Sequence, residues 1–160
     1  MRGLNAGSFA LLLGAGCGGG DADSGPADPG PGTLAISFAM EPDWMTAMDE
    51  EAVGTFHGAV FLADEVGPLG PEEGAQSLAA VDVAVDLRPA GGPTDVLHVT
   101  GELDENDVAI LGFLDTDANA DPEDASPDEG DPVTLPGDNT FSVVGGFETP
   151  VEVFFGLLNP

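Results

Sequence analysis

The chain has almost no basic side chains. Its 160 residues include only two Lys or Arg, Arg2 and Arg88, against 30 Asp or Glu, which gives a formal net charge of −28. A chain of this charge repels nucleic acid and anionic membrane surfaces, so we expect no nucleic-acid or phosphate-binding role. Cations and a basic protein surface are the charged partners that remain. The alternative interpretation is an acidic surface adapted to solubility or to a salty medium.

Cysteine and the polar aromatic residues are equally scarce. There is one Cys, one Trp and no Tyr. A single cysteine excludes an intramolecular disulfide, and the shortage of aromatic rings argues against a sugar-binding platform. No apolar run approaches the ~20 residues that span a bilayer as a helix. In contrast, 42% of the residues are hydrophobic, with 24 Gly and 14 Pro, which predicts a folded domain with many turns.

The first residues, MRGLNAGSFALLLGAGC, have the order of a secretory signal. Arg2 supplies the positive start, Phe9 to Leu13 form a short apolar run, and Gly14 to Gly16 are the small residues that a signal peptidase requires. We therefore predict that residues 1–16 are a signal peptide. Cys17, the only cysteine, follows it directly.

The stretch LGAGC resembles the lipobox of bacterial prolipoproteins, whose cysteine is diacylated and becomes the new N-terminus. It departs from the usual pattern at Gly14, where that family has Leu. The resemblance implies that Cys17 is lipidated and that the chain is held at a membrane by its N-terminal lipid. Gly18 stands where an inner-membrane retention signal has Asp, which implies the outer membrane of a two-membrane bacterium. A non-lipidated signal peptide is the alternative.

Two regions follow the cysteine. Residues 17–32 are rich in Gly, Pro and Asp and contain no large apolar residue, so we expect a flexible tether. From residue 33 to 160, apolar residues recur with period two, which is typical of β-strands. The predicted strands are Leu34–Met40, Thr55–Asp64, Leu78–Leu87, Val96–Leu103, Val108–Leu114, Thr140–Val144 and Val151–Leu158. Short helical turns are expected after Asp43 and at Pro71.

The alternation also predicts which side chains face the core. Val108–Leu114 is apolar on both faces, as expected of a central strand. The inward residues in the other strands include Val81, Val83, Val85, Leu87, Leu97, Val99, Leu103, Val151, Val153, Phe155 and Leu157. Seven short strands separated by turns predict an all-β fold, a single antiparallel β-sandwich. By strand count, it resembles the transthyretin-like and Ig-like modules of bacterial surfaces.

The segment FLDTDANADPEDASPDEGDPV carries many carboxylates and no basic residue, and it opens a long acidic loop predicted to span residues 115–139. Oxygen ligands at alternate positions can wrap one Ca²⁺. We predict seven ligands, namely Asp115, Asp117, Asn119, Asp121, Asp128, Glu129 and Asp131. The opening resembles EF-hand and dockerin loops, but Ala120 and Ser126 replace the expected Gly and Glu, and no amphipathic helices flank it. A loop that is merely solvated is the alternative.

No catalytic constellation stands out. His57 and His98 each lie alone in a predicted strand, and no serine is part of a G-x-S-x-G motif. We therefore expect no enzyme, but a lipid-anchored envelope protein with a calcium-stabilised β-sandwich, acting in binding or in a structural role. The alternatives are a calcium-independent, salt-adapted envelope protein, an accessory subunit that binds a basic partner, and an unrecognised hydrolase.

Overall fold

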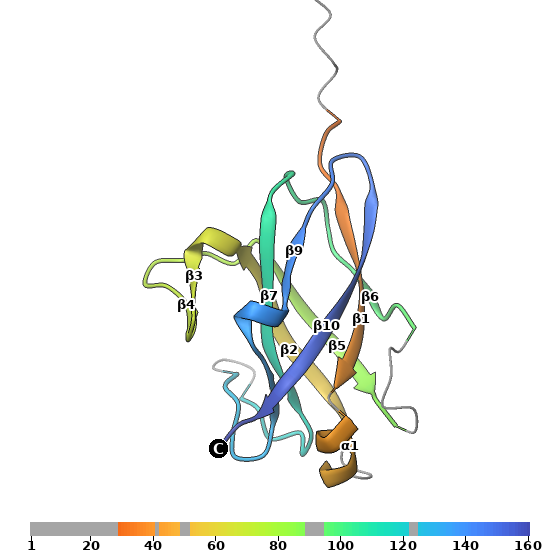
Figure 1. Ribbon diagram of the computed structural model, residues 1–160, viewed down its shortest axis with the longest axis vertical. Coiled ribbons are helices and arrows are strands. Elements are labelled where there is room, and N and C mark those ends of the chain that lie inside the picture. The colour runs from red at the N-terminus through yellow and green to blue at the C-terminus, as the bar shows by residue number, and fades with distance from the viewer. Residues whose placement is uncertain (1–28, 41, 49–51, 89–94, 122–124) are drawn as a thin grey trace, which may run out of the picture.

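The computed structural model describes residues 29–40, 42–48, 52–88, 95–121 and 125–160. The predicted signal peptide, Cys17 and the tether up to residue 28 lie outside these ranges. Within them, no helix combines the length and the apolar character needed to span a bilayer. The secondary structure is mostly β, as predicted (Figure 1).

Most of the chain belongs to one sheet. Its strands are β1 (Thr33–Met40), β2 (Val53–Leu62), β5 (Ala79–Asp86), β6 (His98–Val99), β7 (Asp107–Asp115), β8 (Pro132–Thr134), β9 (Thr140–Ser142) and β10 (Glu148–Leu158). The remaining elements are α1 (Pro42–Met48), a small hairpin of β3 (Val66–Gly67) and β4 (Gly70–Pro71), and the 3₁₀ turns η2 (Ala63–Glu65) and η3 (Pro136–Asp138). The helical turn expected near Asp43 is therefore present as α1. Pro71 itself ends β4, and a turn follows it, in which the Ala75 N–H donates to the Glu72 carbonyl at 3.0 Å.

The sheet curls until it is nearly closed. Its strand order is β5-β2-β7-β8-β10-β1-β6, with β9 also pairing with β7. The prediction of an exclusively antiparallel arrangement is wrong at one pair, because β1 and β10 run parallel from Thr33↔Glu148 to Met40↔Phe155. These two strands come from opposite ends of the chain, so no tight hairpin forces them to run in opposite directions.

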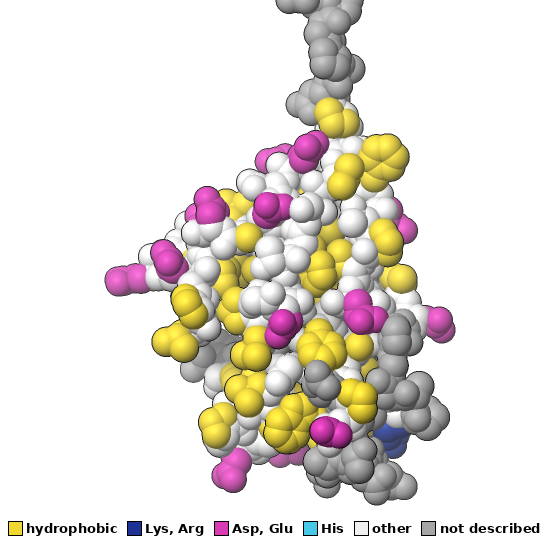
Figure 2. Space-filling model, in the orientation of Figure 1, with side chains coloured by type: hydrophobic (Ala, Val, Ile, Leu, Met, Phe, Trp, Pro, Cys, Tyr) yellow, Lys and Arg dark blue, Asp and Glu magenta, His cyan; other side chains and the backbone are white. Residues whose placement is uncertain are grey.

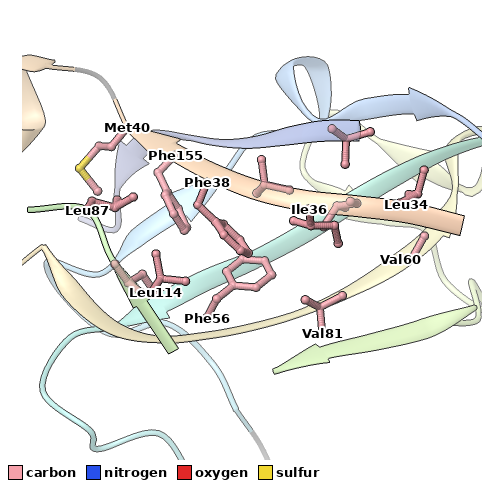
Figure 3. Packing of buried hydrophobic residues seen from close by; sticks show 14 of the residues in the cluster. Leu34, Ile36, Phe38, Met40, Phe56, Val60, Val81, Leu87, Leu114 and Phe155 are labelled. Atoms are coloured by element: carbon pink, nitrogen blue, oxygen red, sulfur yellow. The ribbon is translucent and has the colours of Figure 1, made fainter. Parts of the chain in front are cut away.

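Three phenylalanines form the centre of the core (Figure 3). The Phe38 ring lies 4.9 Å from that of Phe56 and 6.0 Å from that of Phe155, centroid to centroid. The Phe56 ring occupies space that side chains at two glycines of neighbouring strands would need. A Cβ at Gly58 would lie 2.5 Å from this ring, and one at Gly112 would lie 2.7 Å from it. The two glycines therefore make room for the Phe56 side chain.

The predicted inward faces are mostly correct. Val81, Val85 and Leu87 are buried, and Val83 is partly buried, while the central strand β7 is buried on both faces. Leu157 was predicted to face the core but is 41% exposed. The pairing of β10 with β8 shifts register between Phe155 and Leu157, which breaks the alternation, and Leu158 packs against the core instead.

The segment predicted as a strand from Val96 to Leu103 is largely irregular. Only His98–Val99 is a strand, and Leu97 and Val99 are exposed although they were predicted to face inward. Thr100 lies between the expected inward residues, so the alternation places it on the outer face, yet it is buried, and its Oγ1 accepts a 3.0 Å hydrogen bond from the Leu34 backbone N–H. Leu103 is buried as predicted.

The first described residues and the acidic loop lie at opposite ends of the molecule (Figure 1). At one end, Gly32 and Leu103 exchange two 2.8 Å backbone hydrogen bonds, and the Pro31 carbonyl accepts one from Gly146, so the chain is already part of the fold before β1 begins. At the other end lie α1 and the acidic loop. The predicted loop 115–139 is shorter than expected, because β8 and η3 occupy part of it.

Candidate cation site in the acidic loop

The acidic loop connects the end of β7 to the start of β8. It covers residues 116–131, of which residues 122–124 lie outside the described ranges. Asn159, which follows β10, holds the part of the loop from Pro127 to Asp131 in place through hydrogen bonds. Its backbone exchanges 2.8 Å hydrogen bonds with Gly130 and Asp131, and its side-chain amide donates to the carbonyls of Pro127 and Asp128 at 3.1 and 2.7 Å. The loop is thus fixed to the end of β10.

Asp115 is the first predicted ligand, and its carboxylate is turned back toward its own loop. The residue is only 5% exposed. Its oxygens accept hydrogen bonds from the backbone N–H groups of Ala118 at 2.8 Å, Asn119 at 3.3 Å and Ala120 at 3.3 Å. Ala118 has a positive φ of 61°, which helps to bring these amides together. Asp115 therefore stabilises the first turn of the loop.

Asp131 has a similar role where the loop ends. It is only 2% exposed and accepts hydrogen bonds from the backbone N–H groups of Thr116 at 3.4 Å and Asp128 at 3.2 Å. Burial raises the pKa of the Asp131 carboxyl, and the neighbouring Asp128 carboxylate raises it further, although the two N–H donors act in the opposite direction. Asp131 joins the first and last parts of the loop.

Three exposed side chains converge between these two buried carboxylates. The Asn119 side-chain Nδ2 donates to Asp117 Oδ2 at 2.8 Å and to Asp128 Oδ2 at 2.5 Å. One nitrogen therefore bridges two carboxylates from opposite parts of the loop. The sequence pattern placed these three residues in one ligand set, and the structure brings them together.

The remaining predicted ligands are peripheral. Glu129 is exposed and lines a surface pocket of about 410 Å³ together with Asp117, Asp128 and Asp131. Met48 of α1 and Leu158 of β10 form the apolar part of the pocket wall. Asp121 is exposed and does not line this pocket. Among the described residues, no three acidic, His or Cys side chains are arranged as a ready ligand group for a metal ion.

His57 was not assigned to this region from the sequence, but it lies beside it. Its Nδ1 is 2.9 Å from Asp82 Oδ1 on β5, and its Nε2 is 3.9 Å from Asp115 Oδ2. The contact follows from strand pairing, since His57 is opposite Asp82 in the β2–β5 ladder. Alternation alone shows that both residues face outward, but it does not show which strands are neighbours.

No protein-family model matches the chain, and no curated protein or solved structure is significantly similar to it.

Proposed function

We propose that the protein is an exported, lipid-anchored envelope protein whose acidic loop binds Ca²⁺, and that it acts in binding or in a structural role rather than as an enzyme. The lipobox-like LGAGC ahead of the domain supports the anchor. The position of the acidic loop bears on which end of the domain would be attached. The described chain begins at the end of the molecule opposite that loop (Figure 1). A lipid on Cys17 would therefore attach the domain to the membrane, here proposed to be the outer membrane, through the end opposite the acidic loop.

The convergence of Asp117, Asn119 and Asp128 is the observation that supports calcium. Two carboxylate oxygens from opposite parts of the loop accept hydrogen bonds from the same Asn119 nitrogen, at 2.8 and 2.5 Å, so both lie next to one amide. An amide carries an oxygen as well as a nitrogen, so a half-turn of the Asn119 amide would present its carbonyl oxygen to a cation held beside the two carboxylates. Oxygen-only ligands suit a hard cation rather than zinc or copper.

Asp131 and Glu129 are further oxygen donors in this region, since both line the same pocket as Asp117 and Asp128. The role of such an ion would be structural. It would offset the mutual repulsion of these carboxylates and hold the loop against β10. Asp115, which already accepts three backbone hydrogen bonds, would support the turn rather than contact the ion.

A second candidate function, a calcium-independent acidic envelope protein, is favoured by the same hydrogen bonds. Asp115 and Asp131 are balanced by backbone N–H groups, and Asn119 already bridges Asp117 and Asp128. On this account the loop is stable without an ion, and the negative charge serves solubility in salt or attraction of a basic partner.

We also propose that the nearly closed sheet is a flattened sandwich of the Ig-like or transthyretin-like kind. The core supports this proposal. Phe38 on β1 and Phe155 on β10 pack against Phe56 on β2, although β7 and β8 lie between β2 and β10 in the strand order, so the two parts of the sheet face each other across the core.

Calorimetric titration with CaCl₂ separates the two candidate functions. We expect saturable Ca²⁺ binding to the wild-type chain and little heat from Mg²⁺ at equal concentration. The double variant Asp117→Asn/Asp128→Asn should lose this binding. A matched control, Asp104→Asn/Glu105→Gln, removes the same charge from another loop and should retain it. Equal heats from both double variants, or none from the wild type, would favour the calcium-independent account.

The anchor is tested separately. Expression in a bacterium, followed by mass spectrometry of the mature protein, should give an N-terminus at Cys17 carrying acyl chains. The Cys17→Ser variant should be found in the soluble fraction. A mature chain that starts elsewhere, or an unmodified cysteine, would contradict lipidation without affecting the calcium proposal.

A further inference from the structure

The nearly closed sheet has a long free edge at β5. Within the described residues β5 pairs only with β2, from Val53↔Asp86 to Val60↔Ala79. The Leu87 backbone N–H donates to the Ala52 carbonyl at 3.0 Å in the same register. Because antiparallel hydrogen bonding alternates along a strand, every second residue of β5 bonds to β2. The N–H and C=O groups of the others, Ala80, Asp82, Ala84 and Asp86, point away from the sheet.

The opposite end of the sheet is β6, which is short and apolar at its surface. Only two residue pairs join it to β1. Val96 is 52% exposed, Leu97 is 37% exposed and Val99 is 46% exposed. The open side of the sheet is therefore bounded by β5, with its outward backbone groups, and by β6 together with the two exposed aliphatic residues that precede it. Such edges are templates for an added strand.

Charge decides which kind of strand can be added. The exposed face of β5 carries Asp82 and Asp86, whose side chains are 63% and 51% exposed. Hydrogen bonds from Arg88 keep the pKa of Asp86 below its usual value, so this carboxylate stays ionised near neutral pH. A second copy of this chain, also at −28, would place like charges across the new pair. Self-association through this edge is thus disfavoured.

We propose that the free edge of β5 binds an extended, basic segment of another protein as an additional β-strand. Backbone hydrogen bonds to Ala80, Asp82, Ala84 and Asp86 would hold it in register. Asp82 and Asp86 lie four residues apart on one face, about 13 Å along a strand, so Lys or Arg at positions i and i+4 of the partner would meet both. This interaction does not depend on the acidic loop or on calcium.

The probe is a nine-residue synthetic peptide of alternating lysine and valine, titrated into the full-length chain in the presence of a calcium chelator. Its control replaces every valine by proline, which keeps the charge but prevents strand pairing. We expect the lysine–valine peptide to bind at least tenfold more tightly, and nuclear magnetic resonance shifts to centre on β5. Equal affinity for both peptides, no binding of the first, or dimerisation of the chain alone would overturn the proposal.

Variants at one exposed position test the backbone contribution. Ala84→Pro removes an outward N–H without removing a hydrogen bond to β2, and Ala84→Thr keeps that N–H. The proline variant should bind the two peptides with nearly equal affinity, whereas the threonine variant should still bind the lysine–valine peptide more tightly. If the proline variant does not fold, the peptide comparison on the wild type still decides the question. Equal loss, or equal retention, in both folded variants would contradict strand addition.

Discussion

At the scale of single residues, the buried polar side chains are each matched to backbone partners. Asn139 is fully buried, and its side chain makes three hydrogen bonds. Its Nδ2 donates to the carbonyls of Leu135 at 3.0 Å and Phe154 at 2.9 Å, and its Oδ1 accepts from the Phe154 N–H at 2.7 Å. This residue joins the turn before β9 to the middle of β10, and nothing in the sequence marks it out.

Replacing Asn139 by leucine should therefore destabilise the domain strongly. The change removes the side-chain partner of the Phe154 N–H and carbonyl, and it leaves the Leu135 carbonyl with only the Asp138 N–H. Each unsatisfied buried group costs about 1–3 kcal/mol, so we expect a loss of roughly 3 kcal/mol. Denaturant unfolding followed by circular dichroism measures it. The matched control is Asn106→Leu, at an exposed position, which should change the free energy of unfolding by less than about 1 kcal/mol. Comparable losses in both variants would contradict this role.

The raised pKa of Asp131 leads us to expect that the stability of the fold depends on pH. Because the pKa of its carboxyl is raised in the folded state, that state holds the proton more tightly than the unfolded chain does. The free energy of unfolding should therefore increase as the pH falls from neutral toward the usual carboxylate range, and decrease as the pH rises through the raised pKa.

The whole acidic chain gives a dependence of the same sign, so a variant is needed to isolate the contribution of Asp131. Asp131→Asn should show a shallower fall in unfolding free energy with rising pH than the wild type, measured by urea unfolding with a calcium chelator present. Identical pH slopes for the two proteins would show that Asp131 does not titrate differently on folding.

At the scale of elements, the contact between β2 and β7 depends on two glycines. A Cβ at Gly112 would lie 2.3 Å from the His57 carbonyl oxygen and 2.6 Å from the Gly58 Cα, both backbone atoms that cannot move aside without separating the strands. We therefore expect Gly112→Ala to cost about 1–3 kcal/mol.

Thermal and denaturant unfolding measure this cost. Gly137→Ala is the control, since a Cβ there meets nothing within 4 Å, and it should change stability by about 0.5 kcal/mol or less. If Gly112→Ala were as stable as the control, the close approach of β2 and β7 would be in error.

The sequence could predict the elements far better than their arrangement. The apolar pattern identified β1, β2, β5, β7 and β10, and in β7 the apolar run is continuous because that strand is buried on both faces. It failed from Val96 to Leu103, where a buried Thr100 side chain serves as a hydrogen-bond acceptor. It also had no means of finding the parallel β1–β10 pair, since the pairing of distant strands leaves no local pattern.

The candidate site could be predicted only in part. Alternating oxygens correctly grouped Asp117 and Asn119, and the return after Pro127 brought Asp128 to them. The sequence could not show that Asp115 would be turned toward backbone N–H groups, because that depends on the conformation of the turn. Nor could it show that Asn159, at the other end of β10, holds the loop in place.

At the scale of the whole molecule, charge opposes folding. Acidic side chains are scattered across the face seen in Figure 2, and the dark blue of Lys and Arg is visible only at its lower right margin. With 30 acidic and two basic residues, the folded chain repels itself more than the expanded chain does. Salt screens this repulsion, since the Debye length falls from about 30 Å at 0.01 M to about 3 Å at 1 M.

We therefore expect the melting temperature to rise by several degrees between 0.01 and 1 M NaCl, with a chelator present to exclude calcium. Differential scanning calorimetry measures it. A melting temperature that is unchanged or falls over this range would show that the acidic surface does not limit stability, and would weaken the salt-adapted alternative.

The central claim is that Ca²⁺ binds where Asp117, Asn119 and Asp128 converge. Its most direct test is the thermal unfolding of the wild-type chain in excess CaCl₂ and in chelator, at equal ionic strength. The account predicts a higher midpoint with calcium in the wild type, and no difference in the Asp117→Asn/Asp128→Asn variant. A wild-type midpoint that is the same in both solutions, or a gain that persists in the variant, would contradict it.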